Sequence, residues 1–325
     1  MKNGVMLLNL GGPETLADVR PFLYRLFSDP EIIRIKNPVF RRLLAWVISR
    51  IREKKSQDLY RQIGGGSPLR KITESQAAAL ETALAAEGIP ARVYVGMLCG
   101  KPSIDEAFDS ITADGIRRLT LLPLFPQYSR TTTGACFRRV GAIVGRRKLS
   151  EKLEISYIKN WYKNPLSVDV MTDMIAAGLE CFPEKERPDV HIFYSAHSLP
   201  ERYIKEGDPY LDQTRECVSL INDRLNKRFS YGAEYSLAFQ SKVGPVKWLE
   251  PSVEIALGIL ARRGISKILV VPVSFVSDHI ETLYELDIAY RNLAAELNFT
   301  EFRRAESLNA HPKFIATLMD ILTVA

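Results

Sequence analysis

The sequence is poor in the residues that build common metal and redox sites. It holds four cysteines and four histidines in 325 residues, and no two cysteines form the C-x-x-C pair typical of zinc or iron–sulfur ligation. It also lacks an apolar run of 18 residues, the length that a membrane-spanning helix needs. Residues 1–15 have no basic start followed by an apolar stretch and a cleavage site. We therefore expect a cytoplasmic protein with reduced cysteines.

Nucleotide-binding signatures are weak as well. The glycine-rich residues 63–68 could bind an anion through backbone N–H groups, but they lack the lysine of a P-loop. The formal net charge of +6 is uneven, because nine bases stand against two acids within residues 34–61. Such a segment can attract anionic lipid, nucleic acid or an acidic small molecule, or it can be a solvated surface.

Short apolar runs alternate with helical patterns along the chain. This alternation predicts an α/β protein with parallel sheets, built as two similar domains with a boundary near residue 160. The predicted strands cover residues 4–10, 91–97, 118–125, 153–158, 190–195, 234–239 and 267–273. The predicted helices cover residues 73–87, 103–115, 165–181, 210–229 and 252–263.

Residues 22–51 differ from the rest of the chain. Apolar side chains recur there at helical spacing from Phe40 to Ile51, with arginines beside them. A basic amphipathic helix of this kind suits a membrane surface or the lip of an apolar pocket. The alternative is that its apolar side packs onto the domain.

Residues 277–287 carry a dense set of acids and one histidine just after the apolar run 267–273. If this segment is an α-helix, Asp278, Glu281 and Glu285 are spaced i,i+3 and i,i+4, so they share one stripe. The carboxyl end of a strand is where open α/β sheets place their chemistry. The alternative is a solvated acidic helix face.

A second histidine, His197, follows the run 190–195 between small residues. An imidazole there could act as a general base or bind a metal near neutral pH, or it could be structural. Together with residues 63–68, 124–134 and 239–248, the two histidine loops predict one large cleft between the domains. A histidine opposite carboxylates suits Fe²⁺ or proton removal from a ligand, and the apolar and basic surroundings suit a flat anionic aromatic molecule.

Seven stretches in order resemble the motifs of ferrochelatases. They cover residues 9–15, 60–69, 126–134, 195–200, 207–210, 240–245 and 277–287. The family inserts Fe²⁺ into a porphyrin as the last step of haem synthesis. The resemblance implies a chelatase fold of two Rossmann-like domains with the active site in the cleft between them. The first domain would be residues 1–160, with a lip at 22–52 and a C-terminal helix at 311–325, and the second would be residues 161–310.

The resemblance also implies roles for single residues. His197, Glu281 and Glu285 would be catalytic, with His197 accepting pyrrole protons or binding the incoming metal, and Glu281 as the second metal ligand. Their helix would be a π-helix, which changes the spacing of the acids. The residues implied to bind porphyrin are Leu10, Leu23, Leu26, Arg52, Tyr60, Ser67, Phe125, Trp248 and Phe275.

The sequence departs from relatives at a few positions. Leu98 and Cys99 stand where many relatives have arginine and tyrosine, and Ala289 replaces a glutamate of the acidic path. Arg130 stands where cluster-bearing members have a cysteine, so we expect no [2Fe–2S] cluster and no other cofactor. Leu10 in place of a tyrosine favours protoporphyrin over coproporphyrin.

The resemblance finally implies partners. These are protoporphyrin IX and Fe²⁺ as substrates, with no nucleic acid. It also implies transient contact with the preceding enzyme of the haem pathway. The apolar lip would make peripheral contact with the inner face of the plasma membrane. A tetrapyrrole carrier or sensor without turnover is the alternative function.

Overall fold

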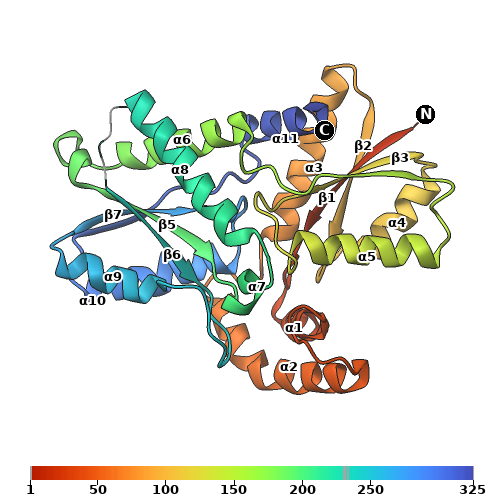
Figure 1. The fold of residues 1–325 in the computed structure, drawn as a ribbon, viewed down its shortest axis with the longest axis horizontal. Coiled ribbons are helices and arrows are strands. Elements are labelled where there is room, and N and C mark those ends of the chain that lie inside the picture. The colour runs from red at the N-terminus through yellow and green to blue at the C-terminus, as the bar shows by residue number, and fades with distance from the viewer. Residues whose placement is uncertain (1, 230–231, 233, 325) are drawn as a thin grey trace. The chain divides into compact units, whose positions relative to one another are not determined.

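The computed structural model describes residues 2–229, 232 and 234–324, and the chain divides into two compact units (Figure 1). The first unit contains residues 1–160 and 318–325, and the second contains residues 161–317. The sequence analysis divided the chain at the same point after residue 160. It differs in assigning residues 311–317 to the first domain.

Each unit contains a parallel four-stranded sheet, which confirms the predicted α/β class. The strand order is β2-β1-β3-β4 in the first sheet and β6-β5-β7-β8 in the second. The central strands are continuous apolar runs because helices cover both of their faces. The strands are β1 (Asn3–Asn9), β2 (Ala91–Met97), β3 (Arg118–Pro123), β4 (Glu154–Tyr157), β5 (His191–His197), β6 (Tyr235–Gln240), β7 (Lys267–Pro272) and β8 (Glu301–Arg304).

Helices cover both faces of the first sheet. Phe108 of α4 and Ile143 of α5 pack with Met6 and Leu121 on one face. Helix α3 packs on β1 and β2 with side chains outside that cluster. The helices of this unit are η1 (Leu16–Asp18), α1 (Val19–Ser28), α2 (Pro38–Arg61), α3 (Leu69–Ala86), α4 (Ile104–Ala113) and α5 (Thr133–Arg146).

The second sheet is covered in the same way. Figure 1 shows α6 and α8 on one side of it and α9 and α10 on the other. Two buried clusters, one on each face, match this arrangement. The helices are α6 (Pro165–Glu180), η2 (Glu184–Asp189), α7 (Glu201–Lys205), α8 (Tyr210–Phe229), α9 (Val253–Arg262), the π-helix η3 (Glu281–Tyr290), α10 (Arg291–Glu296) and α11 (Pro312–Val324), whose last residues group with the first unit.

Helix α2 turns its apolar side chains outward. Phe40 is 63% exposed and Ile51 is 75% exposed, whereas Ala45, Ser49 and Tyr60 are the residues that the helix buries. The alternative that this apolar face packs onto the domain is therefore wrong. Among the helices of the described chain, none has the length and apolarity to span a bilayer.

Candidate active site

The carboxyl ends of β5, β6 and β7 bring one cluster of polar side chains together in the second unit. His197 is the last residue of β5, and Gln240 is the last residue of β6. Ser241 follows at once, while Glu281 and Glu285 lie on η3 beyond β7. Because the strands are parallel and adjacent, residues distant in sequence meet at one edge of the sheet.

His197 and Glu281 form a hydrogen-bonded pair. The distance from His197 Nδ1 to Glu281 Oε2 is 2.8 Å. The His197 backbone is also fixed, because its N–H donates to Ser274 Oγ at 3.0 Å and its carbonyl accepts from Tyr210 Oη at 2.9 Å. With the carboxylate accepting at Nδ1, the neutral ring presents the lone pair of Nε2. That nitrogen has no hydrogen-bond partner among the residues described.

The pair shifts the titration of both partners. Burial lowers the pKa of His197, but the charge of Glu281 and their hydrogen bond outweigh it and raise that pKa overall. Burial raises the pKa of Glu281, but His197 and the hydroxyl of Ser241 lower it well below its ordinary value. An ionised carboxylate beside the ring favours an imidazolium, so His197 is suited to accept a proton.

The hydroxyl of Ser241 lies between the two carboxyl groups. Its Oγ is 2.7 Å from Glu281 Oε2 and 2.6 Å from Glu285 Oε2. A hydroxyl has one hydrogen to donate. Two contacts this short are both hydrogen bonds only if one carboxyl group carries a proton and donates it to the serine oxygen.

Of the two carboxyl groups, Glu285 is the one better suited to hold this proton, because its pKa is raised while that of Glu281 is lowered. Burial, and then the charge of Glu281, raise the pKa of Glu285. Gln240 supports the arrangement, since its Nε2 donates to the Glu281 carbonyl at 2.9 Å and to Glu285 Oε2 at 3.0 Å. The result is a continuous hydrogen-bonded chain from His197 through Glu281 and Ser241 to Glu285.

The backbone of Ser241 is strained. Its φ is +67°, a left-handed conformation that non-glycine residues rarely adopt. Such strain persists only where the surrounding contacts determine it, and it concentrates at functional sites. Sequence reasoning included Gln240 and Ser241 in a motif but assigned them no role, since neither the strain nor the bridging contacts can be seen in sequence.

The π-helix corrects the α-helical spacing first expected for the acidic stripe. Glu281 and Glu285 lie on the same side of the helix and both contact Ser241. Asp278 lies outside this group and accepts hydrogen bonds from Thr282, Ser307 and Asn309 instead. The π-helix that the resemblance implies for the two glutamates is confirmed, and it covers residues 281–290.

Aromatic residues of the second unit flank the pair. The Phe275 ring lies edge-on to His197, with centroids 6.4 Å apart, and 4.6 Å from the ring of His279. Burial lowers the pKa of His279, whose Nδ1 donates to the Ser277 carbonyl. Trp248 forms a bridge to Pro200 after His197, and its buried indole N–H finds no acceptor in the described part of the chain.

The other predicted porphyrin-binding residues belong to the first unit. Leu10 follows β1, Ser67 donates its backbone N–H to the Pro13 carbonyl, and Phe125 packs partly against the core beyond β3. Leu23 is 7% exposed and Tyr60 is 5% exposed, so both leave little surface for a ligand. Their assignment to porphyrin stays a prediction.

The lip residues and the altered positions also lie in this unit. The Arg52 guanidinium lies over the Phe27 ring at 5.7 Å, and Leu26 is half-buried on α1. Leu98 packs partly against the first core, and the buried Cys99 donates its N–H to the Leu10 carbonyl. The two replacements therefore fill packing positions beside β1.

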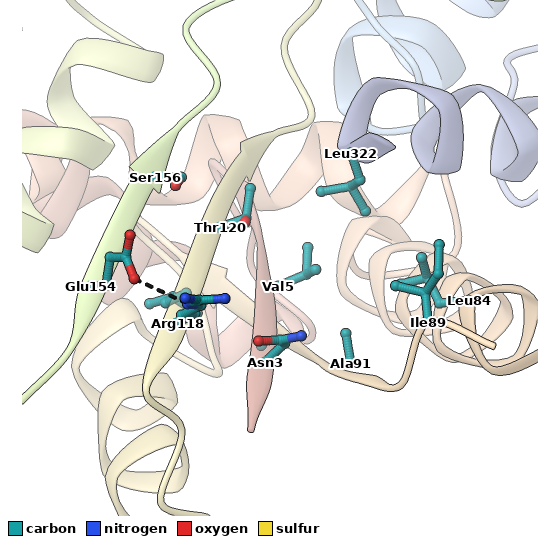
Figure 2. A pocket seen from close by; sticks show the side chains of 12 residues that line it. Asn3, Val5, Leu84, Ile89, Ala91, Arg118, Thr120, Glu154, Ser156 and Leu322 are labelled. Atoms are coloured by element: carbon teal, nitrogen blue, oxygen red, sulfur yellow. Dashed lines mark hydrogen bonds and ion pairs between the residues drawn. The ribbon is translucent and has the colours of Figure 1, made fainter. Parts of the chain in front are cut away.

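A hollow of about 250 Å³ lies elsewhere in the first unit (Figure 2). It is at the amino ends of β1, β3 and β4, with Leu84 and Leu322 at one side. An exposed ion pair between Arg118 and Glu154 crosses the neighbouring strands. None of the predicted site residues lines this hollow.

The described residues do not form a closed metal cage. Among residues 2–229, 232 and 234–324, no three histidine, cysteine, aspartate or glutamate side chains converge to hold a metal ion. The site offers a histidine–carboxylate pair with one open imidazole nitrogen.

Solved structures resemble this fold. SirB from Bacillus subtilis with Fe³⁺ gives a TM-score of 0.56 at 14% identity, covering 99% of this chain and 95% of that one. The sirohydrochlorin chelatase SirB from Bacillus subtilis subspecies spizizenii, in complex with cobalt, gives 0.55 at 13% identity, covering 99% and 94%. These likenesses show the chelatase fold alone.

Sequence comparisons reach further. A family model described as Ferrochelatase matches residues 2–325. A ferrochelatase of Gloeothece citriformis is 49% identical over 98% of this chain and 81% of its own length. One of Synechocystis sp. is 48% identical with the same coverage. This chain belongs to the ferrochelatase family.

Proposed function

We propose that this protein inserts Fe²⁺ into protoporphyrin IX to form protohaem, the last step of haem synthesis. Membership of the ferrochelatase family supports the activity. The observation that carries the mechanism is the hydrogen-bonded chain from His197 through Glu281 and Ser241 to Glu285.

The chemistry requires removal of two protons from pyrrole nitrogens as the metal enters. His197 takes a pyrrole proton at Nε2, and the imidazolium that forms is stabilised by Glu281 at Nδ1. Glu285 releases its proton to solvent, takes the hydroxyl proton of Ser241, and Ser241 takes one from Glu281, which in turn receives the Nδ1 proton of His197. Once the ring has returned to its Nδ1–H tautomer, the same path carries the second N–H proton, and two nitrogen lone pairs are then free for Fe²⁺.

Iron enters this scheme as a substrate. A neutral imidazole and a carboxylate suit a borderline divalent cation, so we propose His197 and Glu281 as the side chains that meet it. The Nε2 lone pair cannot hold a proton and a metal at once. Metal contact therefore precedes or follows proton transfer at this atom. We propose no resident cofactor, the [2Fe–2S] cluster included.

Rigid walls would bend the porphyrin so that a nitrogen lone pair points out of the ring plane. We propose Leu10, Phe125, Trp248 and Phe275 for these walls, and binding elsewhere on the ring would offset the strain. Arg52, Tyr60 and Ser67 would hold the propionates. Leu23 and Leu26 would support the lip.

We further propose a peripheral membrane contact through α2. Its exposed apolar side chains, such as Phe40, Leu43 and Ile51, stand beside basic residues. That combination favours the anionic inner leaflet of the plasma membrane and hence a cytoplasmic location. A surface of this kind would also allow transient contact with the preceding pathway enzyme.

The activity is tested by mixing the purified protein with protoporphyrin IX and Fe²⁺, or Zn²⁺ in place of iron, and following the absorbance change of metalation. Turnover supports the proposal. A binding spectrum without metalation would favour a tetrapyrrole carrier or sensor. Metalation of coproporphyrin in preference to protoporphyrin would overturn the choice of substrate.

A further inference from the structure

The π-helix η3 needs support from outside its own backbone. Extended π-helices are rare, and most π segments are single turns inside α-helices. Here the π geometry continues over ten residues, Glu281–Tyr290. Local hydrogen bonding does not favour this form over an α-helix, so tertiary contacts must hold it.

Arg304 makes such contacts at one point within the segment and at one point just before it. It is the last residue of the edge strand β8, and its side chain is 11% exposed. Its Nε and Nη2 donate to the two carboxylate oxygens of Asp287 at 2.9 and 2.8 Å, which is a bidentate pair. Its Nη1 lies 3.1 Å from Oδ1 of Asp278. One guanidinium thus joins an acid three residues before η3 to an acid inside it.

Asp278 is itself firmly held. Its Oδ1 accepts from Ser307 Oγ at 2.8 Å, its Oδ2 accepts from Asn309 Nδ2 at 2.9 Å, and its N–H donates to Asn309 Oδ1 at 2.9 Å. Thr282 Oγ1 donates to the same carboxylate. The segment after β8 therefore fixes the start of η3 while Arg304 fixes its middle.

We infer that Arg304 is a positioning residue for metal insertion, which sets the π-helical register that aims Glu281 and Glu285 at Ser241. Glu281 and Glu285 lie between the two anchored acids in sequence. A return to α-helical spacing would rotate Glu285 about the axis relative to Glu281. An α-helix also keeps residues spaced i,i+4 on one face, but the rotation would move the Glu285 carboxylate away from its present 2.6 Å contact with Ser241 Oγ. Arg304 itself touches none of these three residues.

This inference rests on the proposed function, and the neighbouring Arg303 provides a matched control. Arg303 is also on β8, pairs with Glu301 at 3.0 Å and lies over the Phe182 ring. In the described part of the chain it makes no hydrogen bond or ion pair with η3. The test compares Arg304→Met with Arg303→Met in the full chain. A third variant, Asp287→Asn, weakens the Arg304–Asp287 pair at its more exposed partner. It tests the same contact if Arg304→Met fails to fold.

Three quantities are measured for each variant: kcat with Zn²⁺ and protoporphyrin IX, the KM for porphyrin, and hydrogen–deuterium exchange of residues 281–290. We expect Arg304→Met to lower kcat by about 10²-fold with KM within about twofold, because small misplacements of reacting groups have large effects on rate. Exchange of residues 281–290 should accelerate. Asp287→Asn should show the same pattern more weakly, and Arg304→Lys should recover part of kcat.

Wild-type kcat in Arg304→Met, or an equal loss in Arg303→Met, would overturn the inference. So would unchanged exchange in both the Arg304 and Asp287 variants. Absence of metalation by the wild type would instead refute the proposed function. In that case the exchange data alone would still decide whether Arg304 holds the π-helix.

Discussion

The two sheets share one strand order but differ at their carboxyl edges. In the first, β1 and β3 lead into Asn9, Leu10 and Phe125, and the next helix, α5, is a regular α-helix. In the second, the corresponding strands β5 and β7 lead into His197 and the π-helix η3. The same scaffold thus presents apolar and amide groups in one unit and a chain of hydrogen-bonded acid and base groups in the other.

The loops also keep their shapes by different means. Those of the first unit depend on close backbone packing: a Cβ on Gly11 would lie 2.6 Å from Gly100 N, and one on Gly66 would lie 2.0 Å from the Glu14 carbonyl oxygen. Those of the second unit depend on side-chain hydrogen bonds around Gln240 and Ser241. Changes in the first unit should therefore affect mainly stability, and changes in the second mainly chemistry.

The largest expected effect is on the chemistry of the second unit. Replacing His197 with alanine removes the proton acceptor, so kcat should fall by at least about 10²-fold. Porphyrin affinity should stay within a few-fold, as titrated by absorbance. Turnover at the wild-type rate would remove His197 from the mechanism.

The next effect is on the stability of the first unit. Gly66→Ala drives a Cβ into the Glu14 carbonyl, so the free energy of unfolding should fall by about 3 kcal/mol. Gly141→Ala is the control, because nothing lies within 4 Å of that Cβ in helix α5 and alanine favours the helix. Urea unfolding of both variants measures the difference, and equal stability would refute the packing argument.

Glu285→Gln should separate stability from turnover. The raised pKa of Glu285 means that the folded protein binds a proton more tightly than the unfolded chain does. Wild-type stability therefore falls as the pH rises from 4.5 through the raised pKa, and the glutamine variant lacks that loss. We expect the variant to melt higher than wild type at pH 8 and to turn over more slowly. A variant that melts lower at pH 8 would contradict the assignment.

The smallest effect concerns the other end of β5. Burial lowers the pKa of His191 to about 4, and its Nε2 lies 2.9 Å from Ser236 Oγ. The unfolded chain takes up this proton first, so stability is lost as the pH falls from 6.5 towards 4. His191→Asn should reduce the free energy of unfolding that is lost between pH 6.5 and 4 by on the order of 1–2 kcal/mol, without changing kcat. If the stability of the variant falls with pH below 6.5 as steeply as that of the wild type, His191 does not titrate in this way.

Much of this fold could be predicted from the sequence. Seven of the eight described strands were identified, because the central ones are apolar runs and turn residues separate them. Strand β8 was missed because three of its four residues are charged and only Phe302 is buried. Helix α5 was also missed, since a loop interpretation of residues 124–134 hid its start.

The site was only partly predictable. His197, Glu281 and Glu285 stood out by residue type and by resemblance. Ser241 and Arg304 did not, because their roles arise from a left-handed backbone and from contacts across 17 to 44 positions of sequence. Spacing alone also predicted an α-helix, since tertiary support for a π-helix cannot be read from one segment.

The most direct test of the proton path is a double-mutant cycle between Ser241 and Glu285. Ser241→Gly removes the hydroxyl and relieves the positive φ, so it isolates the bridge from backbone strain. If protons pass through both groups in series, kcat of the double variant should match that of the slower single variant. Losses that multiply in the double variant would contradict a single path from His197 to Glu285.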